Sequence, residues 1–156
     1  MRCTWQASST YLKSMTAATR VLGHGPRVIE QLNPDTKQMM AAPHAQSWWP
    51  GEMLIELVTV LGFEAAKEVS VRASRDGMGP LVKPLASVVL ALAKSPPEAM
   101  LTRLNTFVSA GVKGVTASFV QNDARNGGTV SFTFPEAVPP VMAAVFGWLL
   151  LGDTLD

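Results

Sequence analysis

Residues Ser95–Phe134 read SPPEAMLTRLNTFVSAGVKGVTASFVQNDARNGGTVSFTF, and this stretch decides the fold that the sequence predicts. It opens with a serine, two prolines and a glutamate, which suit an N-cap, a first helical turn and a capping-box acid. Apolar residues follow at helical spacing: Met100, Leu101, Leu104, Phe107 and Val108. We therefore expect a capped amphipathic helix, which Gly111 and Gly114 end.

The second half of the same stretch alternates between apolar and polar residues. In its first run, Val115, Ala117 and Phe119 alternate with Thr116 and Ser118. In its second run, Val130, Phe132 and Phe134 alternate with Ser131 and Thr133. Asn126-Gly127-Gly128 lies between the two runs and supplies turn residues. Because alternate side chains of a strand point to opposite faces, this pattern predicts an antiparallel β-hairpin with one buried face.

The rest of the chain carries mostly helical patterns. Helices are expected at residues 10–22, 26–32, 51–61 and 138–151, with a further one beginning at Pro80 or Pro84. Residues 36–46 fit either a short helix or a loop, and residues 63–73 fit either a helix or a short strand. The fold class is therefore expected to be α+β, a predominantly helical domain with one antiparallel β-hairpin before a C-terminal apolar helix. We expect residues 1–9 to form a flexible N-terminus and residues 10–156 to form a single globular domain.

Composition favours self-association and argues against nucleic-acid binding. Hydrophobic residues make up 47% of the chain and charged residues 16%, against about 25% charged in an average domain. This excess of apolar side chains over what a small monomer hides favours a homodimer; the alternative is a large core within one chain. The net charge is +1 and no basic block is present, so no nucleic-acid partner is expected.

Cysteine content and hydropathy bear on the compartment. Cys3 is the single cysteine, which leaves no intrachain disulfide and points to a reducing, cytoplasmic location. The N-terminus lacks the apolar region of a signal peptide. Residues 137–152 form the most apolar run, but it is shorter than the roughly 20 residues that span a bilayer. A buried helix is therefore expected there, and no membrane span.

Three groups of residues carry a resemblance to known families. They are Trp49 with Glu52, Met53 and Leu54; Ser95-Pro96-Pro97-Glu98 with Leu101 and Leu104; and Val115 through Phe134. On these the chain resembles an uncharacterised myxobacterial family of paralogues. More distantly, it is similar to the four-vinyl-reductase-like and haem-nitric-oxide-binding-like domains, both of mixed helical and β structure. The resemblance implies a ligand-sensing or dimerising regulatory role.

The chain departs from those families at the residues that carry their chemistry. The vinyl-reductase-like domains tend to hold cysteines in the hairpin, and this hairpin has none. The haem-binding members carry a Tyr-x-Ser-x-Arg motif that binds the haem propionates. Tyr11 is the single tyrosine, and Lys13 and Met15 stand where the serine and arginine would be needed. We therefore expect no cofactor.

Several motifs that could form sites are better explained as ordinary structure. His24 and His44 are isolated in loops, whereas a metal needs about three protein ligands, so no metal is expected. The carboxylate pairs Glu52/Glu56 and Glu64/Glu68 are typical of solvated helix edges. Gly77-Met78-Gly79 lacks the third glycine of a dinucleotide loop. The turn Gly23–Arg27 could bind an anion at a helix start, although a plain turn is favoured.

Two remaining groups give the candidate sites. An apolar ligand pocket is hypothesised from aromatic and methionine side chains, namely Trp48, Trp49, Met39, Met40 and Met53; the alternative is an ordinary corner of the core. A dimer interface is expected on two strongly apolar segments, with Val89, Val145 and Trp148 as its residues. No catalytic residue is assigned.

The function expected from these patterns is a non-enzymatic regulatory or small-molecule-sensing module that acts as a homodimer. The first alternative is a small enzyme or an apolar-cofactor carrier that uses a pocket near Trp48 and Trp49. An interaction or scaffold domain with a protein partner is the second.

Overall fold

The computed structural model describes residues 3–76, 108–109, 111–121 and 128–151. The capped helix expected from Ser95, and Val89 with the helix around it, lie outside these residues. The elements are β1 (Gln6–Ser8), α1 (Ser9–Val21), α2 (Gly25–Gln31), α3 (Pro34–Ala41), the 3-10 turn η1 (Pro43–Ala45), β2 (Trp48–Pro50), α4 (Gly51–Leu61), α5 (Phe63–Asp76), β3 (Val112–Lys113), β4 (Thr116–Gln121), β5 (Gly128–Thr133) and α8 (Val141–Leu151).

This architecture confirms the predicted fold class, a predominantly helical α+β domain in which a β-hairpin precedes an apolar C-terminal helix. The ambiguous residues 63–73 are helical and belong to α5. Residues 36–46 divide between α3 and η1. The last helix begins at Val141 and not at Val138, because Val138 and Pro139 each precede a proline, which disfavours the helical backbone conformation at those two positions.

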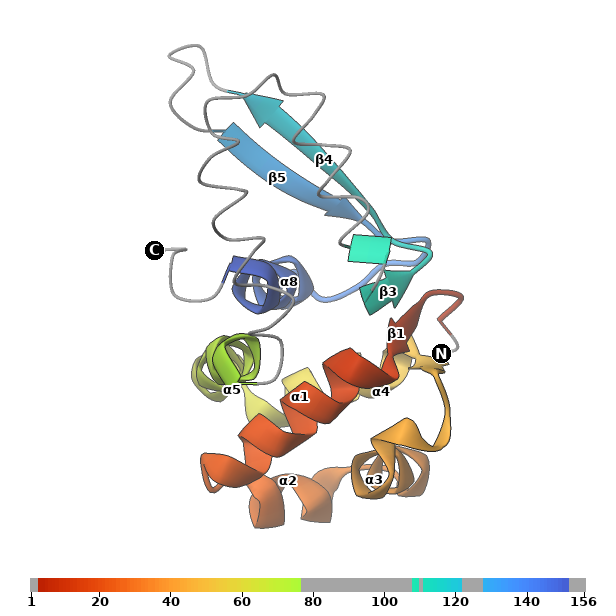
Figure 1. Cartoon of the computed structure of the whole chain (residues 1–156), viewed down its shortest axis with the longest axis vertical. Helices are drawn as coiled ribbons and strands as arrows, with labels where there is room; N and C mark the ends of the chain where they lie inside the picture. Colours follow the sequence, from red (N-terminus) through yellow and green to blue (C-terminus); the bar gives the residue numbers. More distant parts are fainter. Residues whose placement is uncertain (1–2, 77–107, 110, 122–127, 152–156) are drawn as a thin grey trace.

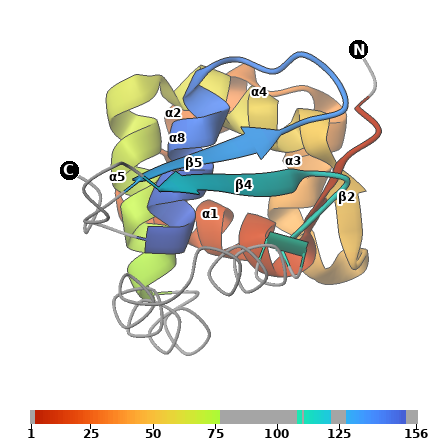
Figure 2. The ribbon, with the colours of Figure 1, turned by 90° about the horizontal axis from the view of Figure 1, so that it is seen from above.

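The helices pack around α1, and the hairpin lies across one side of this helical part (Figure 1). In Figure 1, α1 runs diagonally through the helical part, and α8 lies between α5 and the β4–β5 hairpin. Figure 2 shows the hairpin crossing over α8. The hairpin register pairs Ala117 with Phe132 and Phe119 with Val130. No helix among the described residues is long and apolar enough to cross a membrane.

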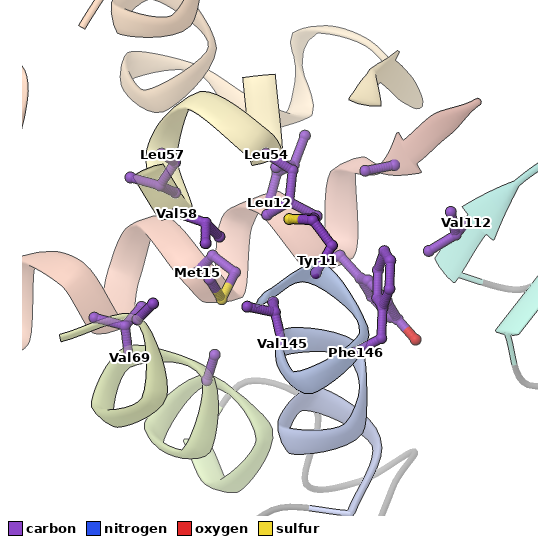
Figure 3. Packing of buried hydrophobic residues seen from close by; sticks show 14 of the residues in the cluster. Tyr11, Leu12, Met15, Leu54, Leu57, Val58, Val69, Val112, Val145 and Phe146 are labelled. Carbon is purple, nitrogen blue, oxygen red and sulfur yellow. The ribbon is translucent and has the colours of Figure 1, made fainter. Parts of the chain in front are cut away.

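The core lies where α1, α4, α5 and α8 meet. Figure 3 shows Leu12 and Met15 of α1 facing Leu54 and Val58 of α4, with Val145 of α8 beside them. Each of these five side chains is buried. Helix α1 is thus covered on most of its circumference, and it is the element to which the others attach.

A small sheet joins segments that are far apart in the sequence. Its strand order is β2-β1-β3, and both neighbours run antiparallel to β1. Ala7 is paired with Trp49 on one side and with Val112 on the other. The prediction of a flexible N-terminus over residues 1–9 is therefore wrong for residues 5–8. They are fixed by strand pairing and by the full burial of Trp5.

An aromatic cluster closes the domain around Trp5. The Trp5 ring packs edge-on against Phe134 and Phe146, with ring centroids 5.2 Å and 6.1 Å apart. Phe134 stacks on Phe146 at 5.4 Å, and Phe132 lies 5.8 Å from the same ring. The cluster joins the N-terminal segment, the hairpin and α8 into one hydrophobic unit.

The expected interface residues of α8 lie inside the chain. Val145 is fully buried, and Trp148 is 7% exposed and packs edge-on against Phe63 at 5.5 Å. The prediction that these two residues form a dimer interface is wrong, because α5 covers one side of α8 and the hairpin covers the other. The absence of charge on this helix reflects burial within one chain.

Candidate functional site

The aromatic and methionine group hypothesised as a pocket belongs to the core. Met39, Met40 and Trp49 are buried members of the hydrophobic cluster, and Met53 packs against it. The indole N–H of Trp49 donates to the backbone oxygen of Pro43 at 2.6 Å. Trp48 is half-buried, and the ammonium of Lys113 lies 4.3 Å from the centre of its ring. These placements agree with the alternative interpretation, an ordinary corner of the core.

A hollow on the other side of α1 has the dimensions of a ligand site. It measures about 410 Å³ and lies between the first turns of α1 and the turn η1. Its lining residues are Ser9, Thr10, Lys13, Ser14, Ala17 and His44. Small-molecule sites usually measure roughly 300–1,000 Å³. We call this feature the α1–η1 hollow.

The backbone around the hollow is held in place by hydrogen bonds. Ser8 caps α1, and its hydroxyl accepts from the amide of Tyr11 at 3.2 Å. The amide of Ser9 donates to the carbonyl of Ser47 at 2.9 Å, which fixes the segment after η1 against the start of α1. The Trp49–Pro43 hydrogen bond holds η1 from the core side. Both walls are therefore arranged before any ligand arrives.

Two ionisable side chains line the hollow, Lys13 and His44, and both are basic. Lys13 and His44 are exposed, and no carboxylate lines the hollow. Within the described part of the chain, neither side chain forms an ion pair. Ser14 lines the hollow as well, and the residue as a whole is 7% exposed.

The carboxylate pair on α4 serves the structure. An oxygen of Glu52 accepts from the amide of Cys3 at 2.9 Å. The two oxygens of Glu56 accept from the amide of Asn33 and the hydroxyl of Thr36, each at 2.5 Å. Glu56 thus caps the start of α3, where backbone amides lack helical partners. Both carboxylates thus have a structural role, which agrees with the interpretation of this pair as part of a helix edge.

Two further motif residues, His24 and Arg27, have structural partners, whereas Gly77-Met78-Gly79 lies outside the described residues. Nε2 of His24 lies 3.5 Å from a carboxylate oxygen of Glu68. The guanidinium of Arg27 donates to the carbonyl of Val60 at 3.2 Å and to that of Leu61 at 3.5 Å, so it caps the end of α4. No group of three or more metal-ligating side chains occurs among the residues that the structure describes.

The N-terminal segment is held by a second carboxylate. Glu136 accepts from the amide of Thr4 at 2.7 Å and from its hydroxyl at 2.5 Å. These bonds, the hydroxyl first, lower the pKa of the Glu136 carboxyl. Burial raises the pKa of the Cys3 thiol, and the charges of Glu52 and Glu136 add to the rise. Cys3 is therefore a weakly reactive thiol in a fixed segment.

Sequence reasoning missed the hollow, although a signal for it exists. On α1, positions 9, 10, 13, 14 and 17 fall on one stripe at helical spacing, and this stripe holds three hydroxyls and a lysine. His44 reaches that stripe only because η1 folds back onto α1. Comparison of the chain with protein-family models, with curated proteins and with solved structures finds no match, so the family resemblance stays a prediction.

Proposed function

We propose that the protein is a non-enzymatic regulatory module that senses a small molecule, and that the ligand occupies the α1–η1 hollow. The observation that supports this most is the hollow itself. It has the volume of a ligand site, and hydrogen bonds from Ser9 and Trp49 fix its two walls in advance. A wall fixed in advance lowers the ordering cost of binding.

A binding role fits the lining better than a catalytic one. A serine nucleophile needs a base within hydrogen-bond reach. In the described part of the chain no hydrogen bond joins His44 to a hydroxyl of the hollow. The lining also lacks a carboxylate that would orient the imidazole. The proposal therefore assigns recognition to these residues and no bond-making step.

The test is a binding screen read out residue by residue. Amide chemical shifts of the ¹⁵N-labelled protein are recorded with a library of neutral, cationic and anionic compounds of metabolite size. We expect at least one compound to shift the amides of Thr10, Ser14 and His44. Ala17→Trp, which fills the hollow, should abolish these shifts. Val21→Trp places the same ring on α1 at a position that is 62% exposed and outside the hollow, so it should preserve them.

A screen in which no compound shifts these amides would reject the proposal. Shifts that Ala17→Trp and Val21→Trp leave equally unchanged would also reject it, because the ligand would then lie elsewhere.

We further propose that the module acts as a cytoplasmic homodimer. Support comes from the apolar composition and from large apolar side chains exposed outside the core, with Val21, Phe63 and Val120 at 62%, 56% and 68%. Because Val145 and Trp148 are buried, the contact surface has to involve other residues. Light scattering at micromolar concentration should report twice the chain mass, and a monomer at that concentration would reject the dimer.

A further inference from the structure

We propose that the outer edge of β5 is the contact surface of the homodimer, and that it pairs with β5 of a second copy of the chain. The two hairpins then form one four-stranded antiparallel sheet across a two-fold axis. This inference deepens the proposed homodimer and rests on it. The burial of Val145 and Trp148 removes the expected contact surface on α8, and the hairpin supplies a different one.

The hydrogen bonds of β5 leave one of its edges open. β5 pairs with β4 along its whole length, from Gly128 opposite Gln121 to Thr133 opposite Thr116. Beyond this ladder, no residue of β5 has a hydrogen bond to any described group. In an antiparallel ladder, every second residue of an edge strand points its amide and its carbonyl away from the neighbouring strand. These unpaired groups of β5 match the backbone of one further strand.

β5 also lacks the features that keep an edge strand from pairing. Charged side chains, prolines and bulges usually protect such an edge. The sequence of β5 is Gly-Thr-Val-Ser-Phe-Thr, without charge or proline, and no bulge interrupts its register with β4. The edge strands of the other sheet differ in this respect, because β2 contains Pro50 and β3 contains Lys113. The edge of β5 therefore favours pairing with another strand.

The exposed face of the hairpin is compatible with a wider sheet. Thr116 and Ser118 of β4 lie opposite Thr133 and Ser131 of β5, and all four residues are exposed. Val120 lies on the same face and is 68% exposed. None of these side chains carries a charge, so joining two copies brings no like charges together.

A second copy of the chain is the partner that fits this edge. A charged foreign strand would find no complementary charge on β5, whereas a second β5 brings none of its own. Two identical strands pair antiparallel across a two-fold axis, so the open edge of each copy satisfies that of the other. The pairing also extends a two-stranded hairpin, which is the least stable form of a sheet.

The experiment places one lysine on either strand of the hairpin. Ser131 of β5 and Ser118 of β4 are direct cross-strand neighbours on the exposed face. In the proposed sheet, Ser131→Lys brings two lysines together where the copies meet, whereas Ser118→Lys keeps both β5 strands between them. Sedimentation equilibrium of the full chain should show self-association weakened about tenfold or more by Ser131→Lys and less than about twofold by Ser118→Lys. Circular dichroism should show the same folded state for both variants.

Amide hydrogen exchange of the wild type gives a second measurement, which decides the matter if Ser131→Lys does not fold. Exchange is recorded at protein concentrations above and below the dissociation constant of the dimer. Every second amide of β5 should exchange about tenfold more slowly in the dimer, and the amides of α3 should not change.

Two results would overturn the inference while leaving the homodimer with another contact surface. They are a dimer that responds equally to the two lysine variants, and a dimer in which the amides of β5 gain no protection. A monomer in the light-scattering measurement would reject the homodimer and this inference together, and the binding screen would still decide the role of the α1–η1 hollow separately.

Discussion

The α-carbon of Gly51 lies so close to the Trp5 ring that an added Cβ would stand 2.3 Å from Cε2 of the indole. The amide of Gly51 also donates to the carbonyl of Trp5 at 3.0 Å. The first residue of α4 is thus clamped against the aromatic cluster by contact and by hydrogen bond. Trp5 is fully buried and has no room to move away.

Gly51→Ala should therefore lower the free energy of unfolding by about 1–3 kcal/mol through overpacking. Gly25→Ala is the matched control, since Gly25 is also the first residue of a helix. Its added Cβ would meet Cγ and Cα of Arg20 at 3.5 Å and 3.8 Å, both ordinary contacts, so we expect a change within about 0.5 kcal/mol. Urea denaturation followed by circular dichroism measures both. Equal effects of the two variants would show that Trp5 does not pack on Gly51.

Glu56 should stabilise α3 from a different helix. Glu56→Gln removes the charge that accepts from Asn33 and Thr36, and we expect a loss of about 1–2 kcal/mol. Glu30→Gln removes an exposed charge without a described partner and should change stability by less than about 0.5 kcal/mol. Hydrogen exchange should show that the Glu56 variant opens α3 first. Uniform loss of protection across all helices would argue against a local capping role.

Sequence periodicity predicted the longer elements because their burial is one-sided or complete. Residues 51–61 were expected to be helical, and α4 spans Gly51–Leu61. The hairpin was read from alternation in the two segments that form β4 and β5. The sheet of β1, β2 and β3 was not foreseen, because strands of two or three residues carry no periodic pattern. Their pairing depends on tertiary contacts between distant segments.

The candidate site was harder to predict for the same reason. The hypothesis of an apolar pocket rested on residue type alone, and burial of Met39 and Trp49 serves the core equally well. The α1–η1 hollow depends on where η1 folds, which local sequence does not state. Likewise, the sequence does not indicate which segments pack against α8. The uniform hydrophobicity of α8 therefore indicated a dimer interface, although in the structure α5 and the hairpin bury this helix.

The Thr4–Glu136 contact predicts a pH dependence at the acid end. Because hydrogen bonds from Thr4 lower the pKa of Glu136 in the folded protein, its stabilising effect is fully present above the usual glutamate pKa of about 4.3 and is lost as pH falls through the lower folded value. A carboxyl-carbon NMR titration should find Glu136 below the usual value. Thr4→Val removes the hydroxyl and should raise it part of the way. A Glu136 midpoint at or above the usual value, unmoved by Thr4→Val, would contradict this account.

Burial of Val145 predicts how a charge acts on α8. Val145→Asp places a carboxylate in a fully buried site without a partner, and we expect loss of cooperative folding. Val120→Asp makes the same replacement in β4, where the side chain is 68% exposed, and should leave the fold intact. Thermal denaturation with circular dichroism distinguishes the two. A folded, monomeric Val145→Asp variant would instead indicate that Val145 lies at a subunit contact.

Trp49 should be a positioning residue for the α1–η1 hollow, because it holds η1 in place from the core side. Trp49→Phe keeps a buried ring but removes the N–H that donates to Pro43, so η1 loses its anchor on the core side. We expect a stability loss of about 1 kcal/mol and weaker binding of any screened compound that shifts the amides of Thr10, Ser14 and His44. The adjacent Trp48→Phe variant is the control, because Trp48 lies outside the hollow and contacts Lys113. It should leave the affinity for that compound unchanged. If both tryptophan variants weaken binding to the same extent, the effect reflects general loosening of β2, and the Trp49–Pro43 hydrogen bond has no specific part in holding the site.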